Sequence, residues 1–454
     1  MIQKLLIANR GEIALRIIRS CKEMGIETVA IYSEADEDSL HVHLADEAIK
    51  IGPASSQKSY LNIQNIISAA LVTSADAIHP GYGFLSENIE FAALCEEHNI
   101  IYVGPQKEHI AKMGDKSEAR ITAIKAGVPV VPGSKEATNQ ADKAQTMADD
   151  IGYPVMVKAV SGGGGRGMRV VNSADEFKDL FNTAKSESQS AFNDDRMYIE
   201  KFVRNPRHIE FQIIGDKHGN VVHLGERDCS LQRRNQKVIE EAPCSILTEE
   251  LRTQMGQSAV KAAQFIGYES AGTIEFLLDD SGNYYFIEMN TRIQVEHPVT
   301  EAITGVDLIK EMIQIASGQP LSFKQEDIEF NGHAIECRIN AENPYKNFRP
   351  SPGKIENCHF PGGYGIRVDS HIYSGYNIPS HYDSMIGKVI VWGANRNEAI
   401  QRMNRAMNEL IIAGIDSNVD FHIKMSEQSQ FIDNQLHTGF INELIESGWL
   451  DKEE

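Results

Sequence analysis

The sequence predicts a mixed α/β and α+β protein built from three domains. The chain has 454 residues, enough for about three domains of ordinary size. Its start reads strand, helix, strand, which is the β-α-β order of a parallel sheet. Beyond this region, strands with alternating polarity and short turns replace that order. We expect a parallel α/β domain at 1–113, a second domain at 114–319 with a lid subdomain at about 132–203, and a compact α+β domain at 320–454.

Composition argues against two classes of partner. Lys and Arg number 44 against 64 Asp and Glu, and the net charge of −20 repels nucleic acid and anionic membranes at long range. No apolar run approaches the roughly 18 residues of a membrane span, and the N-terminus does not resemble a signal peptide. The six cysteines form no Cys-x-x-Cys pair, which favours free thiols over a zinc or redox site. We therefore expect a cytoplasmic protein with no nucleic-acid or membrane partner.

The first domain is predicted from its apolar segments. Residues 2–8 form a strand, a helix with an apolar stripe follows, and 28–32 form the next strand. A further strand at 75–78 ends in the loop His79–Phe84, which contains Tyr82. Parallel α/β sheets bind ligands at the carboxyl ends of their strands, so this loop is a candidate binding segment, although a plain glycine turn is the alternative.

The second domain opens with a helix at 114–127 and a polar surface helix at 134–150. A strand ending at Lys158 then leads into a glycine-rich segment, 161–168. Its glycines fit Gly-x-Gly-x-x-Gly, but a dinucleotide fingerprint must open a helix, whereas 168–171 is strand-like. The segment is better interpreted as a hairpin lid over a triphosphate, because glycine backbone N–H groups can approach phosphate oxygens closely.

Several strands follow the lid. Residues 198–203, 207–214 and 221–225 are predicted strands, and 226–237 is densely polar, for which a solvated charged loop is the alternative to a binding segment. A helix at 249–267 precedes a strand at 272–277 that is expected to form a hairpin with 284–289. The third domain is predicted to contain a strand from 331, short strands up to 391, a helix at 396–412 and a polar tail at 446–454.

The segment 283–301 carries the most informative pattern. Polar residues fall at every second position from Glu288 to Glu296, so they share one side while the backbone stays extended. An edge strand with one solvated face is the alternative, but buried carboxylates and a guanidinium need a metal or charged ligand as partner. The hairpin brings Glu275 beside Glu288 and Asn290, and these oxygen donors suit Mg²⁺. Together with the lid, this arrangement is what phosphoryl transfer requires.

At this point the motifs resemble those of the biotin carboxylases, which are members of the ATP-grasp superfamily. The resemblance extends from Asn9 to about residue 445 and rests on five segments: Gly162–Gly167, Glu226–Ser230, Arg233–Arg234, Glu288–His297 and Glu336–Ile339. It implies that ATP activates bicarbonate as carboxyphosphate, and that the carbon dioxide derived from it carboxylates biotin on a separate carrier protein.

The resemblance also implies roles for individual residues. ATP would be held by Lys116, Lys158, Gly164, Gly165, Glu200, Lys201, Val203, His208, Gln232, Asn235 and Leu277. Mg²⁺ or Mn²⁺, with two ions expected, would be bound by Glu275, Glu288 and Asn290. Bicarbonate would be held by Lys237, Arg292, Gln294 and the backbone of Val295. The catalytic residues would be Arg292, Glu296 as the base, Lys237 and Arg338, and Arg338 would face the biotin ring with Tyr82.

One position departs from the family. Asn235 stands where biotin carboxylases usually have histidine, and asparagine can donate a hydrogen bond to a nucleotide but cannot become cationic. The resemblance further implies a homodimer that works with a biotin carboxyl carrier protein and carboxyltransferase subunits. The expected role is the first half-reaction of acetyl-CoA carboxylase, which leads to malonyl-CoA and fatty acids.

Four alternatives remain at this stage. A biotin carboxylase subunit of another acyl-CoA carboxylase would share every motif, because another subunit selects the acyl group. A different ATP-grasp ligase, such as a carboxylate–amine ligase, would have no reason to combine Arg292, Gln294 and Glu296 with Arg338. A multifunctional pyruvate carboxylase is not expected, since no carboxyltransferase domain or biotin acceptor is recognisable. A pseudoenzyme would be expected to lose metal or base positions, and the sequence keeps them.

Overall fold

The computed structural model describes residues 2–134, 136–160 and 167–450. The chain begins with a parallel five-stranded sheet in the order β3-β2-β1-β4-β5, as the β-α-β pattern predicts. Its strands are β1 (Lys4–Ile7), β2 (Glu27–Ser33), β3 (Glu47–Gly52), β4 (Ala77–His79) and β5 (Ile101–Tyr102). Its helices are α1 (Gly11–Glu23), α2 (Leu40–Leu44), α3 (Ile63–Thr73), α4 (Ile89–Glu97) and α5 (Lys107–Gly114). The apolar stripe of α1, including Ile13, Ile17 and Ile18, is buried against this sheet.

The predicted lid region forms a separate small sheet in the order β7-β6-β8. The helix α6 (Lys116–Lys125) precedes this region, whose elements are α7 (Ala141–Ile151), β6 (Val155–Ala159), β7 (Met168–Val171), α8 (Ala174–Phe192) and β8 (Met197–Lys201). Because β6 and β7 are antiparallel, the glycine-rich segment joins two strands, as predicted. The helix expected at 134–150 was placed too early. Ser134 and Thr138 hydrogen-bond to β8 through their backbones, so the helix begins only at Ala141.

An eight-stranded sheet, in the order β13-β12-β9-β10-β11-β14-β21-β19, forms the centre of the molecule. Its first five strands in sequence are β9 (Arg207–Gly215), β10 (Val221–Arg233), β11 (Gln236–Ala242), β12 (Ser270–Leu278) and β13 (Tyr284–Asn290). The solvated loop considered for 226–237 is wrong. The strand β10 continues to Arg233, β11 begins at Gln236, and Glu226, Arg227 and Asp228 are buried.

The predicted hairpin of β12 and β13 is present, with Glu275 directly opposite Glu288. The expectation of an extended backbone up to Glu296 is wrong, because β13 ends at Asn290 and an irregular turn leads into α10 (His297–Thr304). The strand β13 does lie at the edge of the sheet, yet Asn290, Gln294 and Glu296 are buried. These side chains therefore converge through the turn rather than through strand periodicity.

The last part of the chain adds three strands to the same sheet, so the sheet crosses the predicted boundary at residue 319. Its larger elements are β14 (His333–Asn340), β19 (Ile366–Ser370), β21 (Met385–Gly393), α12 (Arg396–Glu409), α13 (Val419–Ser426), α14 (Ser429–Ile432) and α15 (Phe440–Glu446). This part also contains three short strand pairs: β15 (Glu342–Asn343) with β16 (Arg349–Pro350), β17 (Gly353–Lys354) with β20 (Asn377–Ile378), and β18 (Asn357–His359) with β22 (Ile411–Ala413). The polar tail was predicted to start too early: Leu450 is buried in the core, and Trp449 contacts Phe421.

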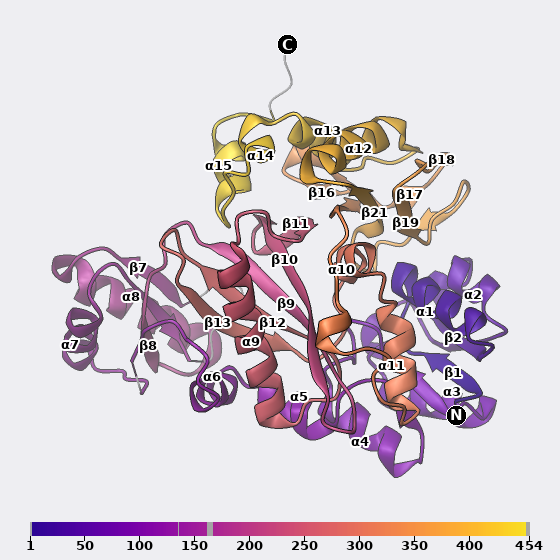
Figure 1. The fold of residues 1–454 in the computed structure, drawn as a ribbon, viewed down its shortest axis with the longest axis horizontal. Coiled ribbons are helices and arrows are strands. Elements are labelled where there is room, and N and C mark those ends of the chain that lie inside the picture. The colour runs from indigo at the N-terminus through magenta and orange to yellow at the C-terminus, as the bar shows by residue number, and fades with distance from the viewer. Residues whose placement is uncertain (1, 135, 161–166, 451–454) are drawn as a thin grey trace.

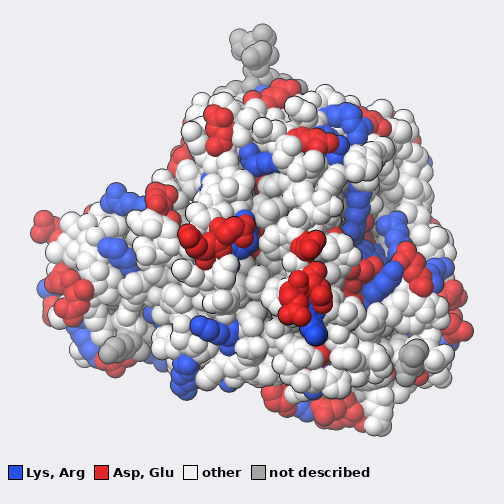
Figure 2. All heavy atoms as spheres, viewed as in Figure 1, with Lys and Arg blue, Asp and Glu red and all other residues white. Residues whose placement is uncertain are grey.

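The three parts surround a common centre (Figure 1). The lid, containing α7 and α8, projects to one side of the central sheet, and the N-terminal sheet lies on the other side. The C-terminal helices cover the end at which β10 and β11 turn, and α9 (Glu249–Ile266) and α11 (Leu308–Ala316) flank the central strands. None of the helices in the described part of the chain has the length and hydropathy that a membrane crossing requires. Acidic and basic side chains are interspersed over the face shown in Figure 2.

Candidate active site

A cavity of about 880 Å³ lies between the lid, the central sheet and the C-terminal region. It brings together most of the residues that the sequence singled out: Lys116, Lys158, Glu200, Lys201, Val203, His208, Gln232, Asn235, Lys237, Glu275, Leu277, Glu288, Asn290, Arg292, Gln294, Val295, Glu296 and Arg338. Gly164 and Gly165 lie outside the described residues. Segments more than 200 residues apart in sequence thus line a single space.

A second cavity, of about 480 Å³, contains Tyr82. It shares Val295, Arg338, Asp383 and Met385 with the larger cavity. The two spaces therefore meet at Arg338. The family resemblance implies that Tyr82 and Arg338 face the same ligand, and in the structure both residues line the smaller cavity.

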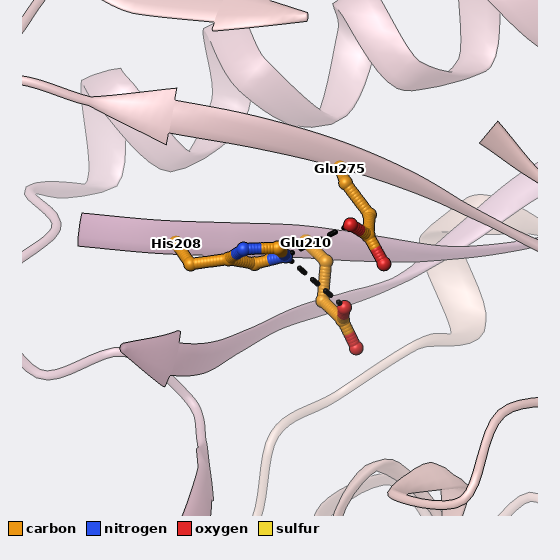
Figure 3. Close-up of side chains that lie close together, drawn as sticks. All are labelled: His208, Glu210 and Glu275. Carbon is orange, nitrogen blue, oxygen red and sulfur yellow. Dashed lines mark ion pairs between the residues drawn. The ribbon is translucent and has the colours of Figure 1, made fainter. Parts of the chain in front are cut away.

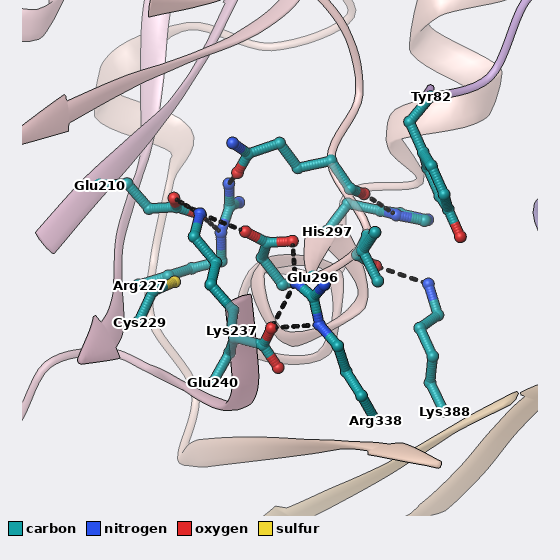
Figure 4. Close-up of polar contacts among 12 residues, drawn as sticks. Tyr82, Glu210, Arg227, Cys229, Lys237, Glu240, Glu296, His297, Arg338 and Lys388 are labelled. Carbon is teal, nitrogen blue, oxygen red and sulfur yellow. Dashed lines mark hydrogen bonds and ion pairs between the residues drawn. The ribbon is translucent and has the colours of Figure 1, made fainter. Parts of the chain in front are cut away.

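The charged centre of the larger cavity is Lys237 on β11 (Figure 4). Its Nζ lies 2.5 Å from Glu210, 2.6 Å from Glu296 and 3.2 Å from Glu275. Burial alone would lower the pKa of Lys237, but the three carboxylates raise it well above its ordinary value. The lysine therefore stays cationic at neutral pH.

The carboxylate of Glu296 is held between two cations. Its oxygens lie 2.6 Å from Lys237 Nζ and 2.9 Å from an Arg338 nitrogen. Burial would raise the pKa of Glu296, but Lys237, Arg338 and Arg227 together lower it well below its ordinary value. Arg338 Nε also donates to Glu240 at 2.6 Å. Burial raises the pKa of Glu240 to about 7, although Arg338 and Lys237 oppose this shift.

Arg227 is a site residue whose role sequence reasoning missed. It is fully buried and donates to Glu210, Gln212, Thr273, Gln294 and Thr300, so it joins four elements beneath the cavity. Glu210 was missed as well, although it lies in the polar row His208, Glu210 and Gln212 at alternate positions of β9. That alternation was the signal that the inward face of β9 is polar.

One histidine and two glutamate side chains lie close together on β9 and β12 (Figure 3). His208 Nε2 lies 3.0 Å from Glu275 and 3.8 Å from Glu210. Burial would raise the pKa of Glu275, but Lys237 and His208 lower it well below its ordinary value. These three residues lie close enough to share a metal ion. However, the Lys237 ammonium lies 2.5 Å from Glu210 and 3.2 Å from Glu275, so it opposes a cation most strongly at Glu210.

The predicted metal set, Glu275, Glu288 and Asn290, lines the same cavity. Glu275 and Glu288 are cross-strand partners, and Asn290 Nδ2 donates to Glu275 at 2.8 Å. Glu288 is about one-third exposed and faces Lys116 at 3.5 Å, so it lies toward the open part of the cavity. Two carboxylates and an amide oxygen form a hard donor set that suits Mg²⁺ or Mn²⁺.

Several residues predicted to bind the nucleotide line the cavity wall next to the lid. Lys158 Nζ pairs with Glu200 at 2.6 Å across β6 and β8. Lys201 differs from its neighbours, because its ammonium donates to the carbonyls of Gly152 and Tyr153. Gln232 donates to the carbonyl of Cys229. The side chains of Lys201 and Gln232 thus have protein partners already, whereas those of Lys116 and Lys158 are more exposed.

The structure gives a physical reason for Asn235. It forms the two-residue turn between β10 and β11 with Arg234, and the φ angles of the two residues are 51° and 62°. Such turns require positive φ at both positions, a conformation that asparagine adopts more readily than most residues. Asn235 lines the cavity from this turn.

Arg292 is held by a residue of the N-terminal region that the sequence did not reveal. Its Nε donates to Glu87 at 2.9 Å, and Glu87 also accepts from the backbone N–H of Thr291 at 3.1 Å. An Arg292 nitrogen donates to Asn290 Oδ1 at 2.9 Å. No local pattern around Glu87 indicates this contact, since the partners are 205 positions apart.

Comparisons with known proteins agree with this geometry. The biotin carboxylase N-terminal domain matches residues 1–110, the ATP-binding domain of the carbamoyl-phosphate synthase L chain matches 115–324, and the biotin carboxylase C-terminal domain matches 336–443. Biotin carboxylase of Nostoc sp. is 59% identical to this protein, and the match covers 97% of this chain and 99% of the relative.

Solved structures give the same answer. The biotin carboxylase domain dimer of Hydrogenobacter thermophilus 2-oxoglutarate carboxylase, in complex with MgADP, ADP and bicarbonate, has a TM-score of 0.91. It is 50% identical, and the match covers 100% of both chains. The biotin carboxylase subunit of pyruvate carboxylase has a TM-score of 0.89 and is 51% identical, again over 100% of both chains. The chain belongs to the biotin carboxylase family and is an ATP-dependent ligase that carboxylates biotin.

Proposed function

We propose that this enzyme is the biotin carboxylase subunit of an acetyl-CoA carboxylase, and that it carboxylates biotin on a separate carrier protein. One observation supports the assignment of the site most strongly: the two cavities meet at Arg338. A carboxyl group activated beside Glu296 would have to pass only this side chain to reach a ring lying against Tyr82.

ATP binds in the larger cavity, where Lys116 and Lys158 offer ammonium groups to its phosphates. Glu275, Glu288 and Asn290 hold the divalent metal, with two ions expected. The bound metal neutralises phosphate charge and so lets an anionic nucleophile approach the terminal phosphate. Leu277 and Met156 supply apolar surface in the same cavity, which suits a nucleotide base. Gly164 and Gly165 complete this proposal as the cover over the phosphates.

Bicarbonate is held by Lys237, Arg292, Gln294 and the Val295 backbone. The Arg292 guanidinium provides a planar fork for two oxygens, and its contact with Glu87 fixes the direction of that fork. Glu296 takes the proton of bicarbonate. Its lowered pKa keeps it ionised, as a base must be, although the same ion pairs weaken it as a proton acceptor. Bound bicarbonate would attract the Lys237 ammonium and so weaken the ion pair between Lys237 and Glu296. The Glu296 carboxylate would then be a stronger base.

Biotin lies in the smaller cavity. Its ureido oxygen gains negative charge when the ring nitrogen loses a proton, and Arg338 stabilises that oxygen. Burial would lower the pKa of Arg338, but the neighbouring carboxylates, of which Glu240 contributes most, leave it raised, so the guanidinium remains charged throughout. Tyr82 forms the opposite wall and donates its hydroxyl to Glu12.

We further propose that the enzyme acts as a homodimer in the cytoplasm, together with a biotin carboxyl carrier protein and carboxyltransferase subunits. The related Hydrogenobacter domain is described as a dimer, which supports the first part. A second candidate role is that of the biotin carboxylase subunit of a different carboxylase. The 51% identity to the biotin carboxylase subunit of pyruvate carboxylase supports it, because the same motifs serve both complexes.

Transfer of labelled carbon from bicarbonate to a biotinylated carrier tests these roles. The enzyme should label the carrier in the presence of MgATP and then, with carboxyltransferase subunits from its own genome, label acetyl-CoA. Labelling of propionyl-CoA or pyruvate in place of acetyl-CoA would establish the second candidate. Absence of carrier labelling, with ATP hydrolysis intact, would contradict the proposed partner.

A further inference from the structure

Lys388 is a fully buried lysine at the junction of the three regions of the chain. It lies on β21, directly opposite Arg338 on β14. Its Nζ donates to the carbonyl of Val295 at 2.5 Å and lies 3.3 Å from Glu12 on α1. One ammonium group therefore contacts the N-terminal helix and the turn before α10 from a strand of the C-terminal region.

The carbonyl that Lys388 holds belongs to the peptide group between Val295 and Glu296. A peptide group is planar, so fixing its oxygen also fixes the directions in which the two residues leave it. One of these residues is proposed to bind bicarbonate through its backbone, and the other is the proposed base. This peptide lies in an irregular turn, where no strand pairing sets its orientation.

The same ammonium acts on the biotin side through Glu12. This carboxylate is buried and accepts a hydrogen bond from the Tyr82 hydroxyl. Lys388 thus contacts the Val295 carbonyl directly and is linked to the Tyr82 hydroxyl through Glu12. A buried ammonium is costly unless it is paired, and apolar packing could fill the space equally well. Its placement is explained by what it holds.

We propose that Lys388 is a positioning residue that sets the peptide between Val295 and Glu296 and, through Glu12, the hydroxyl of Tyr82. This inference rests on the proposed site for bicarbonate and biotin. It predicts that losing the ammonium weakens the use of bicarbonate and biotin while leaving the use of ATP nearly unchanged.

The test uses steady-state kinetics of the full-length enzyme with bicarbonate, biotin and MgATP as separately varied substrates. Lys388→Met should raise KM for bicarbonate about tenfold or more and lower biotin-dependent kcat, with KM for ATP within about twofold of the wild type. The double variant Lys388→Met/Glu12→Gln also removes the negative charge of Glu12, which lies 3.3 Å from the lost ammonium. It should recover thermal stability without recovering KM for bicarbonate.

Lys424→Met is the matched control, because Lys424 also donates to a backbone carbonyl but does so far from the two cavities, at Trp449. It should change none of the three KM values. A double variant with wild-type stability and wild-type KM for bicarbonate would overturn the inference, as would equal increases in KM for ATP and bicarbonate. A wild-type enzyme without bicarbonate-dependent ATP hydrolysis would instead overturn the proposed site itself.

Discussion

The two ends of the main cavity differ in how their charges are held. At the end proposed to bind bicarbonate (the bicarbonate end), the side chains of Lys237 and Arg338 are 13% and 17% exposed, and each contacts two or more carboxylates. At the end proposed to bind the nucleotide (the nucleotide end), Lys116 is 82% exposed and Lys158 is 40% exposed, and each pairs with one glutamate. Arg227 supports the first group from below and is fully buried.

This difference teaches how the two substrates are expected to be recognised. Buried charges with several partners lose little freedom when bicarbonate binds, so their geometry is set in advance of the reaction. The exposed lysines gain most of their partners from the phosphates, so they contribute to binding and little to folding. Substitutions at the bicarbonate end should therefore affect both stability and chemistry, whereas those at the nucleotide end should affect binding alone.

Replacing Lys237 should have the largest effect. Lys237→Met leaves Glu210, Glu275 and Glu296 without their shared cation, and breaking a buried ion pair from one side costs about 3–5 kcal/mol. Urea denaturation should show that loss, and bicarbonate-dependent ATP hydrolysis should fall by about 10³-fold, on the scale of a missing electrostatic stabiliser. Lys158→Met, the matched lysine at the nucleotide end, should cost less than about 1 kcal/mol. Equal losses in both variants would break the comparison.

Removing Arg338 should separate the two half-steps. In Arg338→Ala, biotin-dependent turnover should fall by about 10²–10³-fold, because a donor aimed at developing negative charge is lost. Any bicarbonate-dependent hydrolysis of ATP in the absence of biotin should change much less, since the residues proposed to bind bicarbonate remain. Comparing ADP release with and without biotin gives both numbers. Full biotin carboxylation by this variant, or by Arg292→Ala, would refute the assigned roles.

Glu87 tests whether the bicarbonate end depends on the N-terminal region. Glu87→Gln weakens a charge-assisted contact to Arg292, and a loss of about 1.4 kcal/mol corresponds to a tenfold rise in KM for bicarbonate. KM for ATP should stay within about twofold. Glu90→Gln, a nearby exposed position on α4, serves as the control. An unchanged KM for bicarbonate would show that Arg292 keeps its direction without Glu87.

The smallest effect on stability is expected at Lys116. Because its side chain is largely exposed, Lys116→Met should change the free energy of unfolding by no more than about 0.5 kcal/mol. KM for ATP should nevertheless rise several-fold, as one phosphate partner is lost. Isothermal titration with ADP and thermal unfolding measure the two effects separately. A large destabilisation would show that the nucleotide end is also part of the folded framework.

Sequence patterns were sufficient where a side chain's role follows from its own strand. The β12–β13 hairpin predicted that Glu275 meets Glu288, and the structure confirms the pairing. The β-α-β order at the start of the chain likewise predicted the parallel sheet. In both cases the short-range periodicity of the sequence determines which neighbours meet.

The remaining parts depend on contacts between distant segments. In the sequence, Arg227 is one of several charged residues in a polar segment. Only the structure shows its role, because it places the side chain among five buried hydrogen-bond partners. Glu87 and Lys388 act on residues of other regions, which no local pattern encodes. The prediction of an extended backbone up to Glu296 was wrong, because a turn before α10, rather than alternation along a strand, brings those side chains into the cavity. Leu450 was misjudged because a short polar segment can still bury one apolar side chain.

The central claim is that the buried charges around Lys237 and Glu296 activate bicarbonate for transfer to biotin past Arg338. The most direct test is the rate of ADP release by the wild-type enzyme with MgATP, measured with and without bicarbonate and with and without free biotin. Release should require bicarbonate and should rise severalfold when biotin is added. ADP release that is independent of bicarbonate, or that biotin does not stimulate, would contradict the claim.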